Sequence, residues 1–294
     1  MKTVIIGGVA GGMSAATRLR RLQEDSEIII FEQGSHVSYA NCGLPYHVGE
    51  VIKKESDLLL QTPKALKERF NLDVRVNSRV TKINKEAKTV TVLNLEDNTS
   101  YDESYENLVI STGAKPRALP TPGIERAFVM RDVQDAVKIK KQVDSHNHQS
   151  AVIIGGGFIG IELAENLIHR GVKTTVVQLG SSILPQFDPE IVEPFQAHLV
   201  KNGIDLKLGA SVEQIGPNEV SLSTGEKIPA DFVVSAAGVV PDHHLAVDAG
   251  LRIGESGGIW VDNHQRTSDE HIFAVGDAAE KTSAFTGLGQ QIWL

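Results

Sequence analysis

The chain has 294 residues, of which 41% are hydrophobic, and a formal net charge of −8 at pH 7. This length exceeds that of one ordinary doubly wound domain, so we expect two domains with separate cores. Lys and Arg are interleaved with Asp and Glu, which argues against nucleic acid and membrane surfaces as partners. No apolar stretch approaches the roughly 20 residues that span a bilayer, and the short apolar N-terminus is no signal peptide. With a single cysteine and hence no internal disulfide, the composition predicts a soluble, cytoplasmic protein.

The start of the chain predicts a βαβ unit. Residues 3–6 form an apolar run typical of a central strand in a parallel sheet, and a glycine-rich loop over 7–12 follows it. Small residues and then apolar residues at helical spacing predict a helix over 14–22. A second apolar strand over 27–32 completes the unit.

The next segment predicts antiparallel strands. Valine and isoleucine alternate with polar residues over 74–92, with a turn near 84–86, as in a β-hairpin. A buried strand over 108–113 ends in a glycine, and the prolines after it predict a connection between domains.

The first pattern then repeats. A strand over 151–154, a glycine-rich loop over 155–160, a helix over 161–169 and a strand over 174–177 predict a second copy of the same nucleotide-binding unit. The chain therefore contains an internal duplication.

Further strands complete the second unit and return to the first. A hairpin region lies at about 213–228, and a strand over 232–238 ends the repeat as 108–113 ended the first stretch. A last strand over 272–275 carries a Gly-Asp pair at its C-terminal end, where ligands bind to open α/β sheets. The fold class is α/β: two Rossmann-like doubly wound nucleotide-binding domains, each with a small antiparallel β insertion, the second inserted into the first.

The second glycine-rich loop carries a complete dinucleotide-binding fingerprint, Gly155-x-Gly157-x-x-Gly160. Its glycines permit a tight turn, close approach to a pyrophosphate and close helix packing, and the helix N-terminus favours phosphate charge. The second strand ends in Gln178. Neither an acid for a ribose 2′-hydroxyl nor an Arg for a 2′-phosphate stands there, so the choice between NADH and NADPH stays open.

The first loop departs from this fingerprint because Val9 replaces the middle glycine. Glu32 nevertheless lies twenty positions after Gly12 at a strand end, where a carboxylate accepts the hydroxyls of an adenosine ribose. The alternative for Glu32 is a solvated strand-end charge. Asp277, after Gly276, is a candidate acceptor for a ribitol hydroxyl, with a helix cap as the alternative.

Cys42 lies in a segment with unusual neighbours. An isolated cysteine is most often a small buried hydrophobic residue. Here Ser38 and Asn41 are able to donate hydrogen bonds, and Gly43 allows close approach. A helix starting nearby would favour the thiolate, which attacks disulfides. Because no second cysteine exists, an intramolecular dithiol is excluded.

Two segments, 5–12 and 38–46, together with the order of the motifs, carry a resemblance to a known family. The chain resembles the single-cysteine branch of the FAD-dependent pyridine nucleotide-disulfide oxidoreductases over essentially its whole length. Within that branch it is most similar to the coenzyme A-disulfide reductases and NAD(P)H persulfide reductases, in which the cysteine forms a mixed disulfide with coenzyme A.

The resemblance implies FAD at the first loop and NADH or NADPH at the second. It assigns 1–118 to the first part of the FAD-binding domain, 119–245 to the NAD(P)H-binding domain and 246–294 to the second, truncated part of the FAD-binding domain. The implied cofactor-binding residues are Gly7, Val9, Ala10, Gly11, Gly12, Glu32, Gly113, Gly155, Gly157, Phe158, Ile159, Gly160, Gln178, Gly238, Gly276 and Asp277.

The resemblance also implies catalytic and substrate residues. Phe158 matches an aromatic gate over the flavin and Glu162 a carboxylate near the nicotinamide, with core packing and a solvated helix charge as the alternatives. Cys42 is the implied redox centre. Residues that match a coenzyme A site are Ser14, Arg18, Arg21, Ser38 and Asn41. The two arginines could bind phosphates, or they could belong to a solvated helix face.

Ala10 distinguishes between the branches of this family. Oxygen- and peroxide-reducing members have a histidine at the matching position, and an alanine cannot supply acid–base chemistry. We therefore rank disulfide or persulfide reduction above NADH oxidase or peroxidase activity through a Cys42 sulfenic acid. A nucleotide-binding module without turnover is a third alternative.

Similar proteins continue beyond a segment like 287–294 into a helix that closes the flavin site and a dimerisation domain. The apolar end at Trp293-Leu294 therefore suggests a truncated chain. We expect the parent protein to be a homodimer, and this 294-residue chain to be monomeric and to hold FAD weakly.

Overall fold

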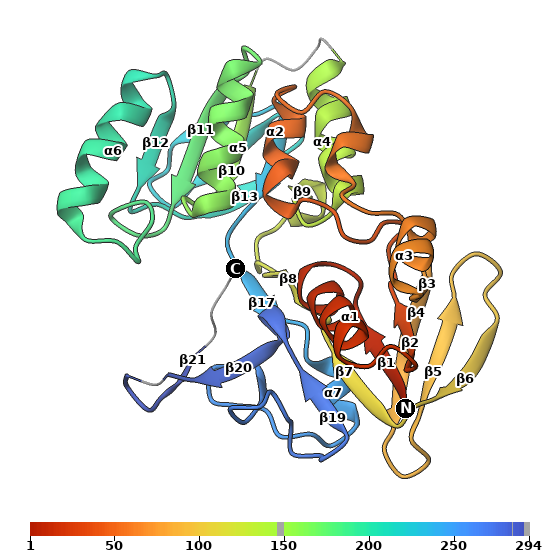
Figure 1. The fold of residues 1–294 in the computed structure, drawn as a ribbon. Helices are drawn as coiled ribbons and strands as arrows, with labels where there is room; N and C mark the ends of the chain where they lie inside the picture. The colour runs from red at the N-terminus through yellow and green to blue at the C-terminus, as the bar shows by residue number, and fades with distance from the viewer. Residues whose placement is uncertain (146–149, 284, 291–294) are drawn as a thin grey trace. The chain divides into compact units, whose positions relative to one another are not determined.

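The computed structural model describes residues 1–145, 150–283 and 285–290 (Figure 1). The chain divides into two compact units. Unit 1 comprises Met1–Tyr39, Leu59–Lys115 and Val240–Leu294, and unit 2 comprises Ala40–Leu58 and Pro116–Val239. The expected cut at Trp293-Leu294 lies outside the described residues.

Unit 1 is built on a five-stranded parallel sheet with the strand order β19-β7-β1-β2-β3. Its first two strands are joined by α1, which confirms the predicted βαβ unit. The bounds are β1 (Lys2–Ile6), α1 (Ala10–Leu22), β2 (Glu27–Phe31), β3 (Asp73–Arg75), β7 (Asn107–Ile110) and β19 (Ile272–Ala274).

Smaller elements complete unit 1. A three-stranded antiparallel sheet has the order β4-β5-β6, and a second small sheet has the order β18-β20-β21. The bounds are α3 (Pro63–Phe70), β4 (Ser78–Asn84), β5 (Thr89–Asn94), β6 (Ser100–Ser104), α7 (His244–Asp248), β18 (Ile259–Trp260), η4 (Gly276–Ala278), β20 (Ala279–Thr282) and β21 (Gly289–Gln290). The predicted hairpin thus begins at Ser78, and Val74 belongs instead to β3, where it pairs with Ile30 of the parallel sheet.

Unit 2 repeats the architecture with a parallel sheet of order β12-β11-β10-β16-β9 and an antiparallel sheet of order β13-β14-β15. The bounds are β9 (Phe128–Val129), α4 (Val133–Asp144), β10 (Ser150–Ile154), α5 (Phe158–His169), β11 (Lys173–Gln178), α6 (Pro189–Lys201), β12 (Asp205–Leu208), β13 (Val212–Ile215), β14 (Glu219–Leu222), β15 (Lys227–Pro229) and β16 (Phe232–Ser235). The α/β fold class with two parallel-sheet units is therefore confirmed.

The segment 40–58 is a part of unit 2 that lies far from the rest of that unit in sequence. It contains η1 (Asn41–Gly43), α2 (Leu44–Val48) and η2 (Glu55–Leu58), and α2 packs against α4 and α5 (Figure 1). The family resemblance assigns this segment to the first FAD-binding stretch, 1–118. The functional domain bounds 1–118, 119–245 and 246–294 stay a prediction, whereas the compact units change at 115/116 and 239/240.

The remaining short elements are η3 (Ile124–Arg126), β8 (Ala114–Pro116) and β17 (Val239–Pro241), and the last two pair with each other.

The cores of the two units follow from strand periodicity. In unit 1, Ile5, Ile28 and Ile30 pack with residues of α1 and α3, whereas Val4 and Ile29 face the opposite side of the sheet. Both faces are covered, as the continuous apolar strands predicted. In unit 2, one face of the parallel sheet packs against the antiparallel strands β13, β14 and β15.

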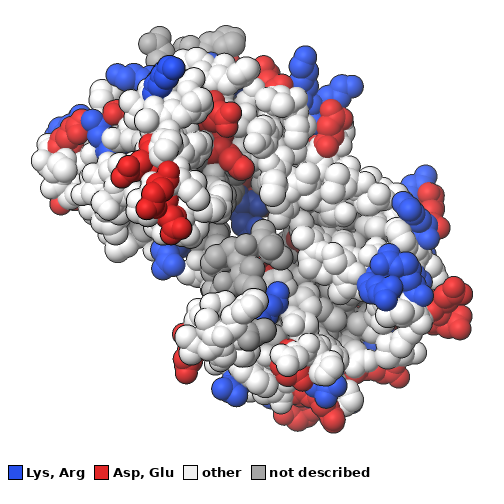
Figure 2. Space-filling view, turned by 60° about the vertical axis from the view of Figure 1, so that its left-hand side comes forward, with Lys and Arg blue, Asp and Glu red and all other residues white. Residues whose placement is uncertain are grey.

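Charged side chains on the face drawn in Figure 2 stand in small groups, and many Lys and Arg lie next to Asp or Glu. Exposed ion pairs contribute little to stability, so the buried cores dominate it. Within the described part of the chain, no helix combines the length and apolar character needed to cross a membrane.

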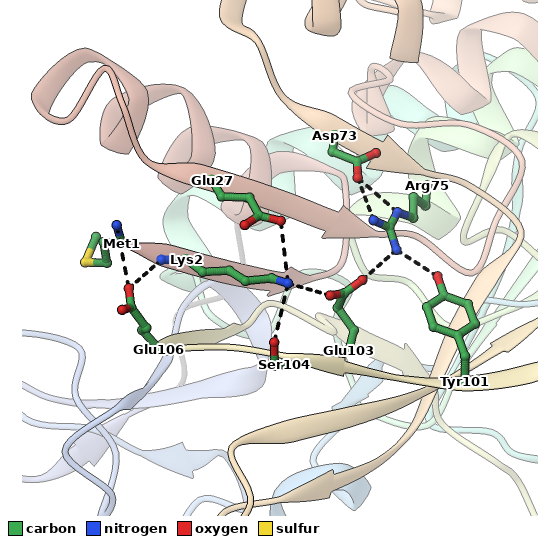
Figure 3. Close-up of polar contacts among 9 residues, drawn as sticks. All are labelled: Met1, Lys2, Glu27, Asp73, Arg75, Tyr101, Glu103, Ser104 and Glu106. Atoms are coloured by element: carbon green, nitrogen blue, oxygen red, sulfur yellow. Dashed lines mark hydrogen bonds and ion pairs between the residues drawn. The ribbon is translucent and has the colours of Figure 1, made fainter.

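A polar network ties three strands of unit 1 together (Figure 3). Lys2 Nζ lies 2.6 Å from Glu103 Oε1, and Arg75 Nη1 lies 2.8 Å from Glu103 Oε2. Arg75 also pairs with Asp73 at 2.7 Å and donates to the Tyr101 hydroxyl at 3.0 Å. Burial opposes ionisation of Glu103, but hydrogen bonds from Lys2 and Arg75 outweigh it and lower the pKa of that carboxyl.

The lowered pKa predicts an acid-sensitive contribution to stability. It is present above the unfolded-state pKa of about 4.3 and is lost as pH falls through the folded-state pKa. We expect Glu103→Gln to lower the free energy of unfolding by about 1 kcal/mol at pH 7 and by less at pH 3.5. Urea denaturation at both pH values measures this, with the more exposed Glu106→Gln as the control. An equal loss at both pH values would contradict the prediction.

Candidate functional site

The second glycine-rich loop joins β10 to α5 in a conformation that requires glycine. Gly155 has φ +114°, and a Cβ built on it would lie 2.3 Å from the carbonyl oxygen of Ala236. A Cβ on Gly160 would lie 2.0 Å from the carbonyl oxygen of Gly155. These glycines thus permit the tight turn and the close helix packing that the fingerprint predicts.

The first loop has the same geometry. Gly7 has φ +103°, and its Cβ would lie 2.1 Å from the carbonyl oxygen of Ser111. A Cβ on Gly12 would lie 1.9 Å from the carbonyl oxygen of Gly7. Val9, in the position of the middle glycine, has φ −107° and ψ −132°. Because its φ is negative, this position does not need the left-handed backbone that favours glycine.

Gly157, the middle glycine of the second loop, is required by neither backbone nor packing. Its φ is −82°, and no described atom lies within 4 Å of a Cβ built on it. The space beside it adjoins the N-terminus of α5, where phosphate groups bind favourably. A side chain at Gly157 would therefore meet a ligand before it met the protein.

Glu32 and Gln178 occupy equivalent positions at the strand ends. Glu32 Oε2 accepts a hydrogen bond from the Gly8 N–H at 2.8 Å, and Oε1 accepts one from the Gly34 N–H at 2.7 Å. Gln178 Oε1 accepts from the Gly156 N–H at 2.9 Å. Glu32 keeps acceptor capacity on both oxygens, whereas Gln178 keeps an amide NH₂ donor. Glu32 thus offers a ribose hydrogen-bond acceptors, whereas Gln178 offers it a hydrogen-bond donor.

Glycine 276 brings the end of β19 to the first loop. A Cβ on Gly11 would lie 2.8 Å from Ser111 Oγ and 3.6 Å from the Cα of Gly276, and Asp277 is half-buried beside it. The glycines that follow β7 and β16 also correspond. Both have positive φ, +70° at Gly113 and +93° at Gly238.

Cys42 is the middle residue of η1, directly before α2, and it is exposed. The predicted helix start near the cysteine is therefore present, although α2 has only 5 residues. Asn41 Oδ1, beside it, is buried without a hydrogen-bond partner among the described residues. Ser38 has φ +48°, and its N–H donates to the Gly8 carbonyl oxygen at 2.9 Å.

Two predicted residues lie one turn apart on α5, which also belongs to unit 2. Phe158 begins the helix, is 57% exposed and meets Phe187 edge to face with ring centroids 6.0 Å apart. Ile159 beside it is also exposed. Burial, and then the charge of Glu165, raises the pKa of Glu162. Phe158 is therefore not a simple core residue, and Glu162 is not a fully solvated charge.

Tyr46 links the cysteine segment electrostatically to α5. The charge of Glu162 is the largest cause of its raised pKa, followed by burial, Glu165 and Cys42. These four groups therefore lie within electrostatic reach of one another in unit 2. Tyr46 and Glu165 were not predicted, although Tyr46 follows Cys42 by four residues and a helix there would place the two on one face.

The predicted substrate residues of α1 lie on an exposed face. Ser14, Arg18 and Arg21 are all exposed, and neither arginine has a polar partner in the described ranges. Arg20 between them is buried and donates to the carbonyl oxygen of Phe70 at 2.8 Å. Of the three arginines of α1, only Arg20 therefore has a structural role within the fold. Ala10 begins the helix and is exposed.

Among residues 1–145, 150–283 and 285–290, no cluster of three or more His, Cys, Asp or Glu side chains is placed to hold a metal ion. The chemistry available at the site is that of a thiol, carboxylates and phosphate-binding loops.

Known proteins resemble the chain over nearly all of its length. A family model described as pyridine nucleotide-disulphide oxidoreductase matches residues 1–291. Coenzyme A disulfide reductase of Staphylococcus epidermidis is 31% identical over 291 residues, which is 99% of this chain and 66% of that protein. The Staphylococcus aureus enzyme is 32% identical over 280 residues, 95% of this chain and 63% of that protein.

Solved structures give the same picture. Reduced Bacillus anthracis CoADR-RHD has a TM-score of 0.97 and 43% identity, and covers 100% of this chain and 54% of that one. An NAD-dependent persulfide reductase from A. fulgidus has a TM-score of 0.96 and 36% identity, covering 100% and 56%. The chain thus spans about two thirds of the length of these curated relatives and about half of these solved chains.

The contrast between two loop glycines yields a prediction. Gly157→Ala should leave the melting temperature unchanged, because the added Cβ meets open space, but should weaken NADH binding by about tenfold or more. Gly160→Ala should destabilise unit 2 because its Cβ meets the Gly155 carbonyl oxygen. Thermal denaturation and NADH fluorescence titration separate the two effects. Unimpaired NADH binding by Gly157→Ala would argue against a ligand in this space.

Proposed function

Because the chain belongs to the pyridine nucleotide-disulphide oxidoreductase family, we propose that it uses NAD(P)H to reduce a low-molecular-weight disulfide or persulfide of the coenzyme A type. The supporting observation is the arrangement of unit 2. Its exposed Cys42, the only cysteine of the chain, shares this unit with the complete fingerprint loop and with Glu162. Relatives named as coenzyme A disulfide reductase and persulfide reductase support the same chemistry.

The residues of unit 1 fit FAD. Glu32 keeps free acceptor sites for ribose hydroxyls, and the N-terminus of α1 follows Val9 directly, where phosphate charge is favoured. Asp277 would accept from the ribitol chain. The loop glycines Gly7 and Gly12 would let the pyrophosphate approach the backbone. When bound, FAD supplies the means of turning a hydride into two electrons for a disulfide.

Unit 2 fits a nicotinamide dinucleotide. The loop from Gly155 to Gly160 would hold the pyrophosphate, and the open space at Gly157 would admit it. By the family resemblance, Phe158 would be the aromatic gate over the flavin, and Glu162 would lie near the nicotinamide. Gln178 presents a donor that either a ribose hydroxyl or a 2′-phosphate accepts.

The covalent step belongs to Cys42. Its thiolate attacks one sulfur of the substrate disulfide, the S–S bond breaks, and one thiol leaves as a thiolate that takes a proton from solvent. The Cys42 mixed disulfide then accepts two electrons and one proton, which releases the second thiol and restores the Cys42 thiolate. Overall, one disulfide, one NAD(P)H and one proton give two thiols and NAD(P)⁺.

A coenzyme A thiol fits the substrate residues. Arg18 and Arg21 are exposed and keep their guanidinium donors available for phosphates, and Ser14 lies on the same face of α1. Asn41 Oδ1, which has no hydrogen-bond partner among the described residues, adds a polar group next to the cysteine in unit 2. Ala10 offers no acid–base group, which disfavours a sulfenic-acid oxidase or peroxidase cycle.

The cysteine assignment yields the first test. Cys42→Ser should abolish reduction of coenzyme A disulfide, because a serine hydroxyl forms no mixed disulfide, and should leave flavin reduction by NADH within about twofold of wild type. Anaerobic flavin absorbance and thiol release measure the two reactions. Persistent thiol release by the serine variant would remove Cys42 from the mechanism.

The strand-end amide yields a second test. With Gln178 the preference between NADH and NADPH should be below about tenfold, because its NH₂ group serves either cofactor. Gln178→Glu should shift the preference towards NADH, since a carboxylate accepts from the ribose and repels a 2′-phosphate. Ratios of kcat/KM for the two cofactors report the shift. A gain on NADPH would mean that position 178 does not face the ribose.

A further inference from the structure

One face of α5 connects the dinucleotide loop to the cysteine segment. Phe158, Glu162, Asn166 and Arg170 recur at intervals of four residues along the helix and its C-cap, and we call them the α5 stripe. Phe158 and Glu162 are already placed in the proposed mechanism. Asn166 and Arg170 have no part in it, yet both contact the end of α2.

Asn166 packs against Gly49, the residue that follows α2. It is 3% exposed, and its Nδ2 donates to the Glu162 carbonyl oxygen at 2.8 Å. A Cβ on Gly49 would lie 1.9 Å from Asn166 Oδ1 and 2.8 Å from Asn166 Cβ. Gly49 has φ −74° and ψ −2°, which any residue adopts. The close approach of Asn166, and not the backbone conformation, therefore requires glycine here.

Arg170, one helical turn after Asn166, also contacts the C-terminal end of α2. Its Nη1 donates to the Val48 carbonyl oxygen at 3.0 Å, which satisfies a C-terminal carbonyl of α2. Its Nη2 pairs with Asp144 at 2.7 Å, and its Nε lies 3.8 Å from Glu50. The Arg170 side chain is 17% exposed, so these contacts are partly shielded from water.

Lys140 of α4 closes the cluster. It pairs with Glu50 at 3.0 Å and with Asp144 at 2.8 Å. The hydrogen bond from Lys140, and then the charge of Arg170, lowers the pKa of Glu50. The end of α2 is thus fixed to α4 and α5 by packing, a backbone hydrogen bond and ion pairs.

We propose that Asn166 and Arg170 are positioning residues for Cys42. They fix the C-terminal end of α2 to the helix whose first turns carry Phe158 and Glu162, and so place the thiol that precedes α2 relative to the dinucleotide loop. This inference rests on the proposed function for its catalytic consequence, but the placement itself is testable without any cofactor. Positional errors near 1 Å are enough to slow catalysis substantially.

The test uses the single cysteine as its reporter. DTNB, an aromatic disulfide, reacts with the Cys42 thiolate to give one mixed disulfide and one coloured thiolate, so its rate reports Cys42 alone. Gly49→Ala and Arg170→Ala should each raise this rate by about threefold or more, because a released segment samples more exposed conformations. His169→Ala, an exposed neighbour on α5, is the matched control and should leave the rate unchanged.

A compensating variant separates positioning from general damage. Gly49→Ala combined with Asn166→Gly removes the clash and should return the DTNB rate close to that of Asn166→Gly alone. If Gly49→Ala or Arg170→Ala fails to fold, Arg170→Gln replaces it in the DTNB assay. This substitution removes the ion pairs of Arg170 at a partly exposed site. Thermal denaturation shows which variants are folded at the assay temperature.

Half-reactions then test the catalytic consequence. With FAD loaded, flavin reduction by NADH should change by less than about twofold in Arg170→Ala, whereas reduction of coenzyme A disulfide should slow by about tenfold. A folded variant with wild-type DTNB and disulfide rates would overturn the positioning role. If the wild-type chain reduces no disulfide but the DTNB pattern holds, the proposed function fails and the placement of Cys42 stands.

Discussion

The contact between a carbonyl oxygen and the Cα of a glycine five residues later underlies both units. The carbonyl of Gly7 packs against Gly12, and that of Gly155 packs against Gly160, so tightly that no Cβ fits at either place. Each contact holds the following helix close to its sheet and directs the helix N-terminus at the loop. In unit 2 the consequence extends along α5, because every residue of the α5 stripe takes its position from that starting point.

Sequence patterns predicted the parts of the molecule whose constraints are local. Glycine spacing, apolar runs and alternation identified both loops, the parallel strands and the duplication, because steric limits on φ and the burial of strands act over a few residues. The placement of Val74 failed because a three-residue edge strand and a hairpin strand share the same alternation. Nothing local placed 40–58 in unit 2, or Tyr46 near Glu162, because these contacts join segments that lie far apart in the sequence. In the sequence, Gly49 likewise resembles an ordinary glycine at a helix end, and only the structure shows that Asn166 packs against it.

The two units correspond in backbone structure as far as the turn at Ser38 in one copy and Leu184 in the other. After that turn, the side chains differ in chemistry. Ser38 and Leu184 both have positive φ, +48° and +45°, and each donates its N–H to the middle of its glycine-rich loop, at Gly8 and Gly156. Beyond that turn, the first copy leads to a thiol at Cys42 and the second leads to the aromatic ring of Phe187. The same backbone therefore supports two different groups, which illustrates how function depends on side chains grafted onto a repeated scaffold.

The discontinuity of unit 1 constrains how the chain acquires its structure during synthesis. The edge of β7 is covered by β19, which begins at Ile272, whereas the central strands of unit 2 are complete by Ser235. On the ribosome, β7 therefore presents unpaired backbone groups throughout the synthesis of the second unit. The nested order of the two units thus leaves one apolar strand edge unpaired until β19 has been made, and non-local pairings of this kind form slowly.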